Sequence, residues 1–200
     1  NSTGDMPGAI DAGGNAVIVA ATADLTGVTI TNHNNLTVNV GQTLDLTAAQ
    51  ATAFNAGGTF TNNGTVNVSA TGDLSAQNLD NVTTLTLTGT STLPNSTADM
   101  PGAIDAGGNA VTVAATADLT GVTITNYNAL TVNAGQTLSL TIAQYDAFKT
   151  VGITNNGTVN VTTSGDLSAK NLSSITNLTL DGDATLPNST GDMPGAIDAG

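Results

Sequence analysis

A stretch of 13 residues occurs three times in this chain, and this repetition constrains the fold more than any other feature. Residues 1–13 return at 95–107 with one change, Gly4 to Ala98, and return unchanged at 188–200. A catalytic domain has no reason to begin and end with the same residues, whereas a segment of a periodic array does. Internal repeats on this scale are typical of elongated repeat architectures.

The remainder of the chain follows the same period. Residues 1–94 align with 95–187 after one deletion near Thr59, and most aligned positions are identical. The sequence therefore predicts one repeat at 1–94, a second at 95–187, and the start of a third at 188–200. We expect either a longer parent chain or copies that stack end to end, since neither end resembles a polar cap.

Within a repeat, apolar residues alternate in short triplets, which is typical of strands with one buried face. In the first repeat these triplets are 17–19, 28–30, 36–38, 44–46, 66–68 and 85–87. Asn, Asp and Gly clusters between them predict turns. The predicted turns are 32–35, 39–41, 62–64 and 71–73.

One segment of each repeat predicts a short helix. Residues 47–54 and 141–148 each begin with a Thr that can cap a helix and continue with several Ala residues. One or two helical turns there are expected to cover a side of the strands.

Two all-β folds fit this pattern. The first is a β-solenoid of short stacked strands built from the 94-residue repeats. The alternative is a row of immunoglobulin-like β-sandwiches, for which 94 residues is a usual size. Because Trp is absent and aromatic residues make up 2% of the chain, large core anchors are scarce, and the solenoid is favoured.

Composition excludes several classes of partner. All 15 acidic residues are Asp, and Lys149 and Lys170 are the basic residues, which gives a net charge of −13. Such a chain does not suit nucleic acid or an anionic membrane surface, because both require basic side chains. No apolar run approaches the length needed to cross a membrane.

Two recurring runs resemble repeats of large bacterial surface proteins. These runs are Leu-Thr-Val-Asn-x-Gly-Gln-Thr-Leu-x-Leu-Thr at 36–47 and 130–141, and Asn-Asn-Gly-Thr-Val-Asn-Val at 62–68 and 155–161. The texture of the whole chain is similar to giant adhesins, filamentous-haemagglutinin-like proteins and some S-layer proteins. This resemblance implies an exported protein at the bacterial cell surface, with roles in filaments or biofilm, and often with calcium-stabilised turns.

Catalytic constellations are not apparent in the sequence. The chain lacks Cys, Glu and Arg, and its single histidine, His33, is matched by Tyr127 in the second repeat. We interpret His33 as an exposed turn residue, and we expect no enzymatic activity. Asp146 does not recur between repeats and is interpreted as a solubilising surface residue.

Aspartates that recur between repeats are the candidate metal ligands. Oxygen-rich turns suit Ca²⁺, which takes six to eight ligands, but such Asp residues also form Asx turns with their own backbone, and we favour the turn role. The calcium candidates are Asp5, Asp11, Asp24, Asp73, Asp99, Asp105, Asp118 and Asp166.

The sequence therefore predicts a structural segment of an extracellular fibre, stalk or surface layer that spans distance and associates with itself. The alternative is an adhesin module that binds a ligand or glycan during cell attachment. Exposed aromatic residues usually stack on sugars, but Tyr127 and Tyr145 occur in the second repeat alone, so this alternative is weaker.

Overall fold

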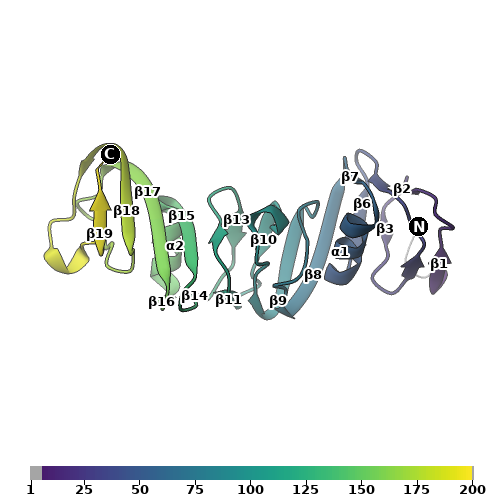
Figure 1. Ribbon diagram of the computed structural model, residues 1–200, viewed down its shortest axis with the longest axis horizontal. Coiled ribbons are helices and arrows are strands. Elements are labelled where there is room, and N and C mark those ends of the chain that lie inside the picture. The colour runs from purple at the N-terminus through teal and green to yellow at the C-terminus, as the bar shows by residue number, and fades with distance from the viewer. Residues whose placement is uncertain (1–5, 200) are drawn as a thin grey trace.

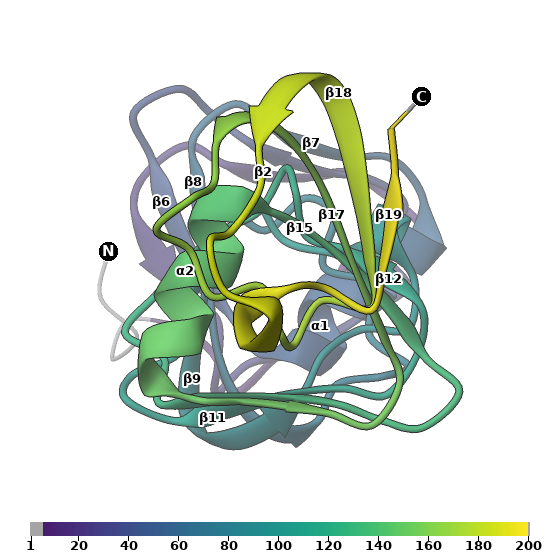
Figure 2. The ribbon, with the colours of Figure 1, turned by 90° about the vertical axis from the view of Figure 1, so that its left-hand side faces the viewer.

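The computed structural model describes residues 6–199. The molecule is elongated, and its strands run across the long axis (Figure 1). Viewed along that axis, the chain winds repeatedly around a common centre (Figure 2). Most of the regular structure is β-strand, with two short helices.

Equivalent elements occur in the two sequence repeats. The first repeat contains β1 (Ala9–Asp11), β2 (Val17–Val19), β3 (Ala23–Asp24), β4 (Thr29–Thr31), β5 (Leu36–Val38), β6 (Thr43–Leu46), α1 (Ala48–Gly57), β7 (Phe60–Asn62), β8 (Thr65–Asp73) and β9 (Thr84–Thr92). The second contains η2 (Thr97–Asp99), β10 (Ala103–Asp105), β11 (Ala110–Val113), β12 (Ala117–Asp118), β13 (Thr123–Thr125), β14 (Ala129–Val132), β15 (Thr137–Thr141), α2 (Ile142–Val151), β16 (Ile153–Asn155), β17 (Thr158–Asp166) and β18 (Asn177–Thr185). The final segment contains η3 (Thr190–Asp192) and β19 (Ala196–Asp198).

Strand pairing is parallel in every ladder of residues 6–199. Leu85 pairs with Val68, and Phe60 pairs with Leu36, so the partner in each case belongs to the preceding turn of the chain. Each strand therefore lies on the strand one winding before it, which is consistent with the predicted β-solenoid class. Immunoglobulin-like sandwiches consist of antiparallel sheets, so this pairing contradicts the alternative.

The core is a set of stacked aliphatic rows. Leu46, Val68, Leu85 and Ile104 occupy corresponding places on successive windings, and each is at most 1% exposed. Alternation along each strand sends these side chains inward and the intervening Thr, Asn and Asp outward. The first and last residues of the predicted triplets are therefore buried, except Val17 and Ile30, which are half-buried.

The triplets match strands to within a residue at their start, but two strands extend much further. β8 and β9 continue past the apolar triplets at 66–68 and 85–87 to nine residues each. The predicted turn at 71–73 is wrong, because Gly72 lies inside β8, where the register shifts. Its φ of 82° lets the strand bend around a corner without ending.

Both predicted helices form, and both are longer than expected. Thr47 caps α1 and Thr141 caps α2, each in a capping box with the Gln three residues later. Phe54 and Phe148 anchor the helices in the core. No helix of residues 6–199 has the length and apolarity needed to span a membrane.

The repeat does not contain a whole number of windings. The nine-stranded sheet includes β3 and β10, whereas β12, the counterpart of β3, lies in a separate five-stranded sheet. The residue stacked on Ile104 of β10 is Ile124, so one winding runs from Ile104 to Ile124. Ala117 of β12 lies within this winding and pairs with Leu138 in the other sheet. Equivalent features therefore point in different directions, as α1 and α2 do around the axis in Figure 2.

Candidate functional site

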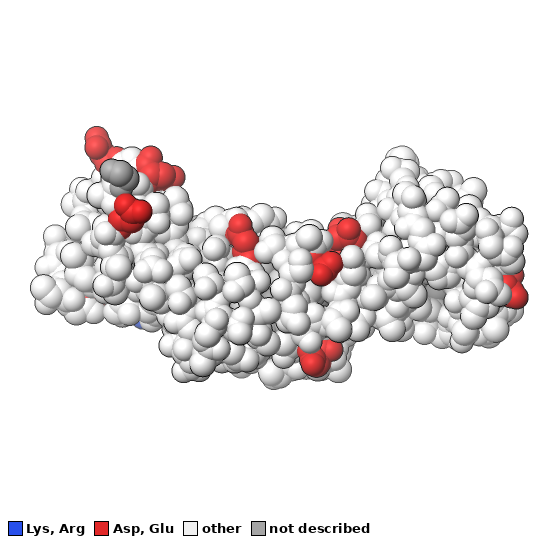
Figure 3. Space-filling view, viewed as in Figure 1, with Lys and Arg blue, Asp and Glu red and all other residues white. Residues whose placement is uncertain are grey.

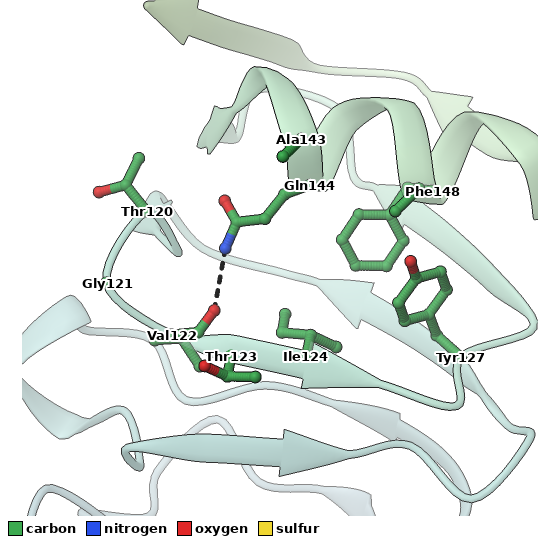
Figure 4. A pocket seen from close by; sticks show the side chains of 10 residues that line it. Thr120, Gly121, Val122, Thr123, Ile124, Tyr127, Ala143, Gln144 and Phe148 are labelled. Atoms are coloured by element: carbon green, nitrogen blue, oxygen red, sulfur yellow. Dashed lines mark hydrogen bonds between the residues drawn. The ribbon is translucent and has the colours of Figure 1, made fainter.

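A groove runs beside each helix, at the place where the helix replaces a strand in the stack. At α2, the Gln144 side chain reaches across to the preceding winding (Figure 4). Its Nε2 donates to the Leu119 carbonyl at 2.6 Å and to the Val122 carbonyl at 2.9 Å. Its Oε1 accepts from the Thr141 N–H at 2.8 Å. One glutamine thus caps the helix and replaces the donors of the missing strand.

The groove beside α2 has a volume of about 340 Å³ and is open to solvent. Tyr127 closes one end, with its ring 4.3 Å from that of Phe148 (Figure 4). The first repeat has the corresponding groove, of about 370 Å³, between Thr26–Ile30 and α1. Because Tyr127 is partly buried against Phe148, it does not offer a free face for a sugar.

β13 forms the floor of the groove beside α2, and one edge of this strand pairs with no described strand. Thr123 N–H donates to Gly102, and the Thr125 carbonyl accepts from Ala106, so both residues face β10. Alternate residues of a parallel strand point to opposite sides, so the N–H and C=O of Ile124 face the groove. Among the described strands, none pairs with this edge of β13. It can pair with one residue of an extended chain.

Six of the eight candidate aspartates form Asx turns, as the sequence analysis favoured. In each turn the carboxylate accepts from the backbone N–H two residues later at 2.9–3.0 Å. The pairs are Asp11 with Gly13, Asp24 with Thr26, Asp73 with Ser75, Asp105 with Gly107, Asp118 with Thr120, and Asp166 with Ser168. Asp99 ends η2, and Asp5 lies outside the described residues.

Two of these aspartates also accept a hydrogen bond from a side chain of the next winding. Asp105 accepts from the Asn126 amide at 2.9 Å, and Asp11 accepts from Asn32 at the same distance. Both asparagines adopt a left-handed backbone, with φ of 53° and 52°, which Asn tolerates better than most residues. Each Asp–Asn hydrogen bond therefore links two consecutive windings at a corner.

Hydrogen bonding lowers the pKa of several of these carboxyl groups. For Asp105 the Gly107 N–H has the largest effect on the pKa, followed by the Asn126 amide, because both bonds favour the ionised form. The pKa is lowered in the same way at Asp11 by Gly13, at Asp73 by the Ser75 side chain, and at Asp166 by the Ser168 N–H.

This lowered pKa predicts a pH dependence. A carboxyl group with a lower pKa in the folded chain adds stability above about pH 4 and loses it as the pH falls through the folded pKa. Asp105→Asn keeps the acceptor without the charge. The difference in urea midpoint between wild type and Asp105→Asn should be constant between about pH 7 and pH 5 and shrink below about pH 4. Circular dichroism at each pH measures it, and a difference that grew on acidification would contradict the prediction.

The arrangement of carboxylates does not assemble a calcium site. Residues 6–199 contain no group of three or more His, Cys, Asp or Glu side chains placed to hold a metal ion. On the face shown in Figure 3, the acidic side chains are spread along the molecule. Ca²⁺ needs six to eight oxygen ligands, so these turns taken singly do not fit it. Calcium binding stays a prediction from the sequence.

Both lysines make side-chain contacts at α2, Lys149 from within the helix and Lys170 from the chain after β17, and the sequence analysis did not predict these contacts. Lys170 forms an ion pair with Asp146, and Lys149 donates to Ser174 at 2.7 Å. In the first repeat, Thr52 and Gln77 occupy the places of Asp146 and Lys170 and share a neutral hydrogen bond at 2.9 Å. Both positions differ between the two repeats, and this joint change in the sequence indicates that the two residues contact each other. Such a partly exposed pair contributes little to stability.

His33 is not the exposed turn residue that was predicted. Its ring lies 4.5 Å from that of Phe54, and its Nδ1 is buried without a hydrogen-bond partner among the described residues. A Cβ at Gly57 would lie 2.5 Å from the ring. His33 therefore has the same packing role as Tyr127 in the second repeat.

Comparison of the chain with protein-family models, with curated proteins and with solved structures gives no match.

Proposed function

We propose that this chain is a structural segment of an extracellular fibre, stalk or surface layer, built as a β-solenoid that spans distance and associates with itself. The observation that carries the proposal is the stacked parallel ladder from β3 to β13, in which each winding buries the aliphatic row of the last. Such a stack transmits load along its axis through backbone hydrogen bonds. Regular repetition also lets it be lengthened without a new fold.

The dimensions suit a spacer. Successive strands in a sheet are separated by about 4.8 Å, so one repeat of about four and two-thirds windings extends the molecule by about 22 Å. The side chains that point outward from its strands are mainly those of Thr, Asn and Asp. The resemblance to bacterial surface repeats supports a location outside the cell.

Self-association is proposed to use the open strand edges. The Ile124 edge beside α2 and the Ile30 edge beside α1 are unpaired by any described strand, and such edges invite pairing with another chain. Because equivalent features point in different directions, copies can meet on more than one side. The net charge of −13 opposes this contact, so salt, divalent cations or acid should promote it.

Negative-stain electron microscopy tests this proposal. We expect filaments or laterally joined rods whose number rises with added salt, with millimolar calcium, or as the pH approaches the sequence pI of about 4.1. A calcium requirement that magnesium cannot meet would favour calcium binding. Isolated rods under every condition would rule out self-association, and assemblies that salt disperses would contradict the expectation that charge repulsion limits it.

A matched pair of variants tests the role of the edges. Ile30→Pro combined with Ile124→Pro removes the two free N–H donors without breaking a ladder hydrogen bond. The double variant should keep the wild-type circular dichroism spectrum and lose lateral association. Thr26→Pro combined with Thr120→Pro lies outside β4 and β13 but removes the N–H that bonds each Asp turn. This second double variant should lower stability more than the first.

A further inference from the structure

The chain contains two Asn-Gly pairs, Asn63-Gly64 and Asn156-Gly157, at the same corner of each repeat. Asn followed by Gly is the dipeptide most prone to deamidation, because the bare glycine lets its amide nitrogen reach the asparagine side chain. Both asparagines are exposed. Neither side chain is used by the contacts described above.

Glycine cannot be replaced at this corner. A Cβ at Gly64 would lie 2.4 Å from the Gln42 carbonyl and 2.6 Å from the Asn39 carbonyl. A Cβ at Gly157 would lie 2.4 Å from two backbone carbonyls, those of Asn133 and Gln136. The close approach of consecutive windings therefore forces a reactive pair onto the surface.

The preceding asparagine restrains the reactive nitrogen. The Gly64 N–H donates to Asn62 Oδ1 at 3.0 Å, and the Gly157 N–H donates to Asn155 Oδ1 at 3.1 Å. Attack requires that nitrogen to lose its proton, and a proton held by an acceptor is lost less readily. Both glycines are also half-buried.

The next winding holds this asparagine in place. Asn62 Nδ2 donates to the Asn81 carbonyl and to Thr83 Oγ1, both at 3.0 Å. Asn155 makes the same two bonds, to Ser174 at 3.0 Å and to Thr176 at 3.1 Å. The acceptor for each glycine N–H is therefore oriented by the winding stacked above it.

We propose that Asn63 and Asn156 are deamidation sites that Asn62 and Asn155 keep unreacted while the stack is intact. In the reaction, the glycine nitrogen bonds to the asparagine Cγ, its proton is lost, and the side-chain amide leaves as ammonia. Water then opens the cyclic imide to aspartate or isoaspartate. Where the winding above separates, the side chain of Asn62 or Asn155 is no longer held in place, and the adjacent asparagine reacts.

The product damages the stack at that point. Isoaspartate adds a methylene to the main chain, at a residue whose N–H bonds to the winding below. Asn63 N–H donates to the Val38 carbonyl and Asn156 N–H to the Val132 carbonyl, each at 3.0 Å. Deamidation would therefore mark loosened windings and weaken them further, so the guard extends the life of the chain.

The test measures deamidation at both sites of one folded molecule. Wild type, Asn62→Ala and Asn62→Asp are incubated at mildly alkaline pH, and peptide mapping by mass spectrometry quantifies each site. Loss of one net hydrogen bond, about 1.4 kcal/mol, corresponds to about tenfold in rate. We expect Asn62→Ala to accelerate Asn63 about tenfold while Asn156 keeps its wild-type rate.

Two control variants separate the effect of the Asn62 acceptor from a general loosening of the stacked windings. Asn62→Asp retains an acceptor for Gly64 but loses the Nδ2 bonds to the next winding, so it should react more slowly than Asn62→Ala. Asn155→Ala should move the effect to Asn156. Equal rates in Asn62→Ala and wild type, equal rates in Asn62→Ala and Asn62→Asp, or a folded wild type as reactive as the chain in urea would each overturn the proposal.

Discussion

Replacing Gln144 by alanine should lower the free energy of unfolding by about 3 kcal/mol. The change leaves the Leu119 and Val122 carbonyls and the Thr141 N–H without the partners that Gln144 supplies at 2.6–2.9 Å. Each polar group left unsatisfied in a partly buried site costs about 1 kcal/mol or more. Urea unfolding followed by circular dichroism measures the loss.

Three further variants give this experiment its controls. Gln50→Ala should produce a similar loss in the first repeat, since Gln50 bonds Leu25 and Val28 in the same way. Gln144→Glu keeps the acceptor but points a carboxylate at two carbonyls, so it should restore nothing. Thr150→Ala, on the exposed side of α2, should change stability by less than about 0.5 kcal/mol. A loss below about 1 kcal/mol for Gln144→Ala would mean that Gln144 does not dock the helix.

Local pattern was enough to predict the helix starts and most strands of the first repeat, although β1, β3 and β7 lie outside the predicted triplets. Triplets such as 36–38 match strands because alternation of side chains is a property of the strand itself. The cap at Thr141 was predictable because a Thr ahead of a helix-forming segment closes on a backbone N–H only three residues later, here that of Gln144. The Asx turn at Asp105 is equally local, since it closes over two residues.

Contacts between windings could not be predicted in this way. The two carbonyls that Gln144 bonds lie 22 and 25 residues earlier in the chain, and no short pattern indicates them. Gly72 predicts a turn at 71–73 because glycine promotes turns, whereas Gly72 and Asp73 pair with the next winding. The burial of His33 is not predictable from its neighbours, because its packing partner, Phe54, belongs to the next winding and is distant in the sequence.

Comparison of the two repeats gives information about contacts between windings that short sequence patterns do not contain. Positions that contact each other across windings change together, as Asp146 and Lys170 do relative to Thr52 and Gln77. The same comparison exposes the coupling of His33 to Gly57, because the second repeat has Tyr127 and Val151 in these places. Two repeats within one chain therefore carry some of the information that an alignment supplies.

Leu85→Asp should destabilise the chain by more than about 4 kcal/mol and divide its unfolding into two steps. Leu85 is fully buried and stacks between Val68 and Ile104, near the junction of the repeats. A carboxylate there has no partner and must be protonated or hydrated. Because each winding contacts mainly its neighbours, the break should uncouple the two sides rather than unfold the whole chain.

Thr84→Asp is the matched control, because it adds the same charge one residue away. Thr84 faces outward between Asn67 and Ala103, so an added carboxylate there meets solvent and neutral neighbours. Its effect should stay within about 0.5 kcal/mol, with a single unfolding transition by circular dichroism and calorimetry. A slip of one residue in the register would exchange the inward and outward rows, so Thr84→Asp would become the damaging change. The order of the two variants therefore tests whether the rows of Leu, Val and Ile point inward along the stack.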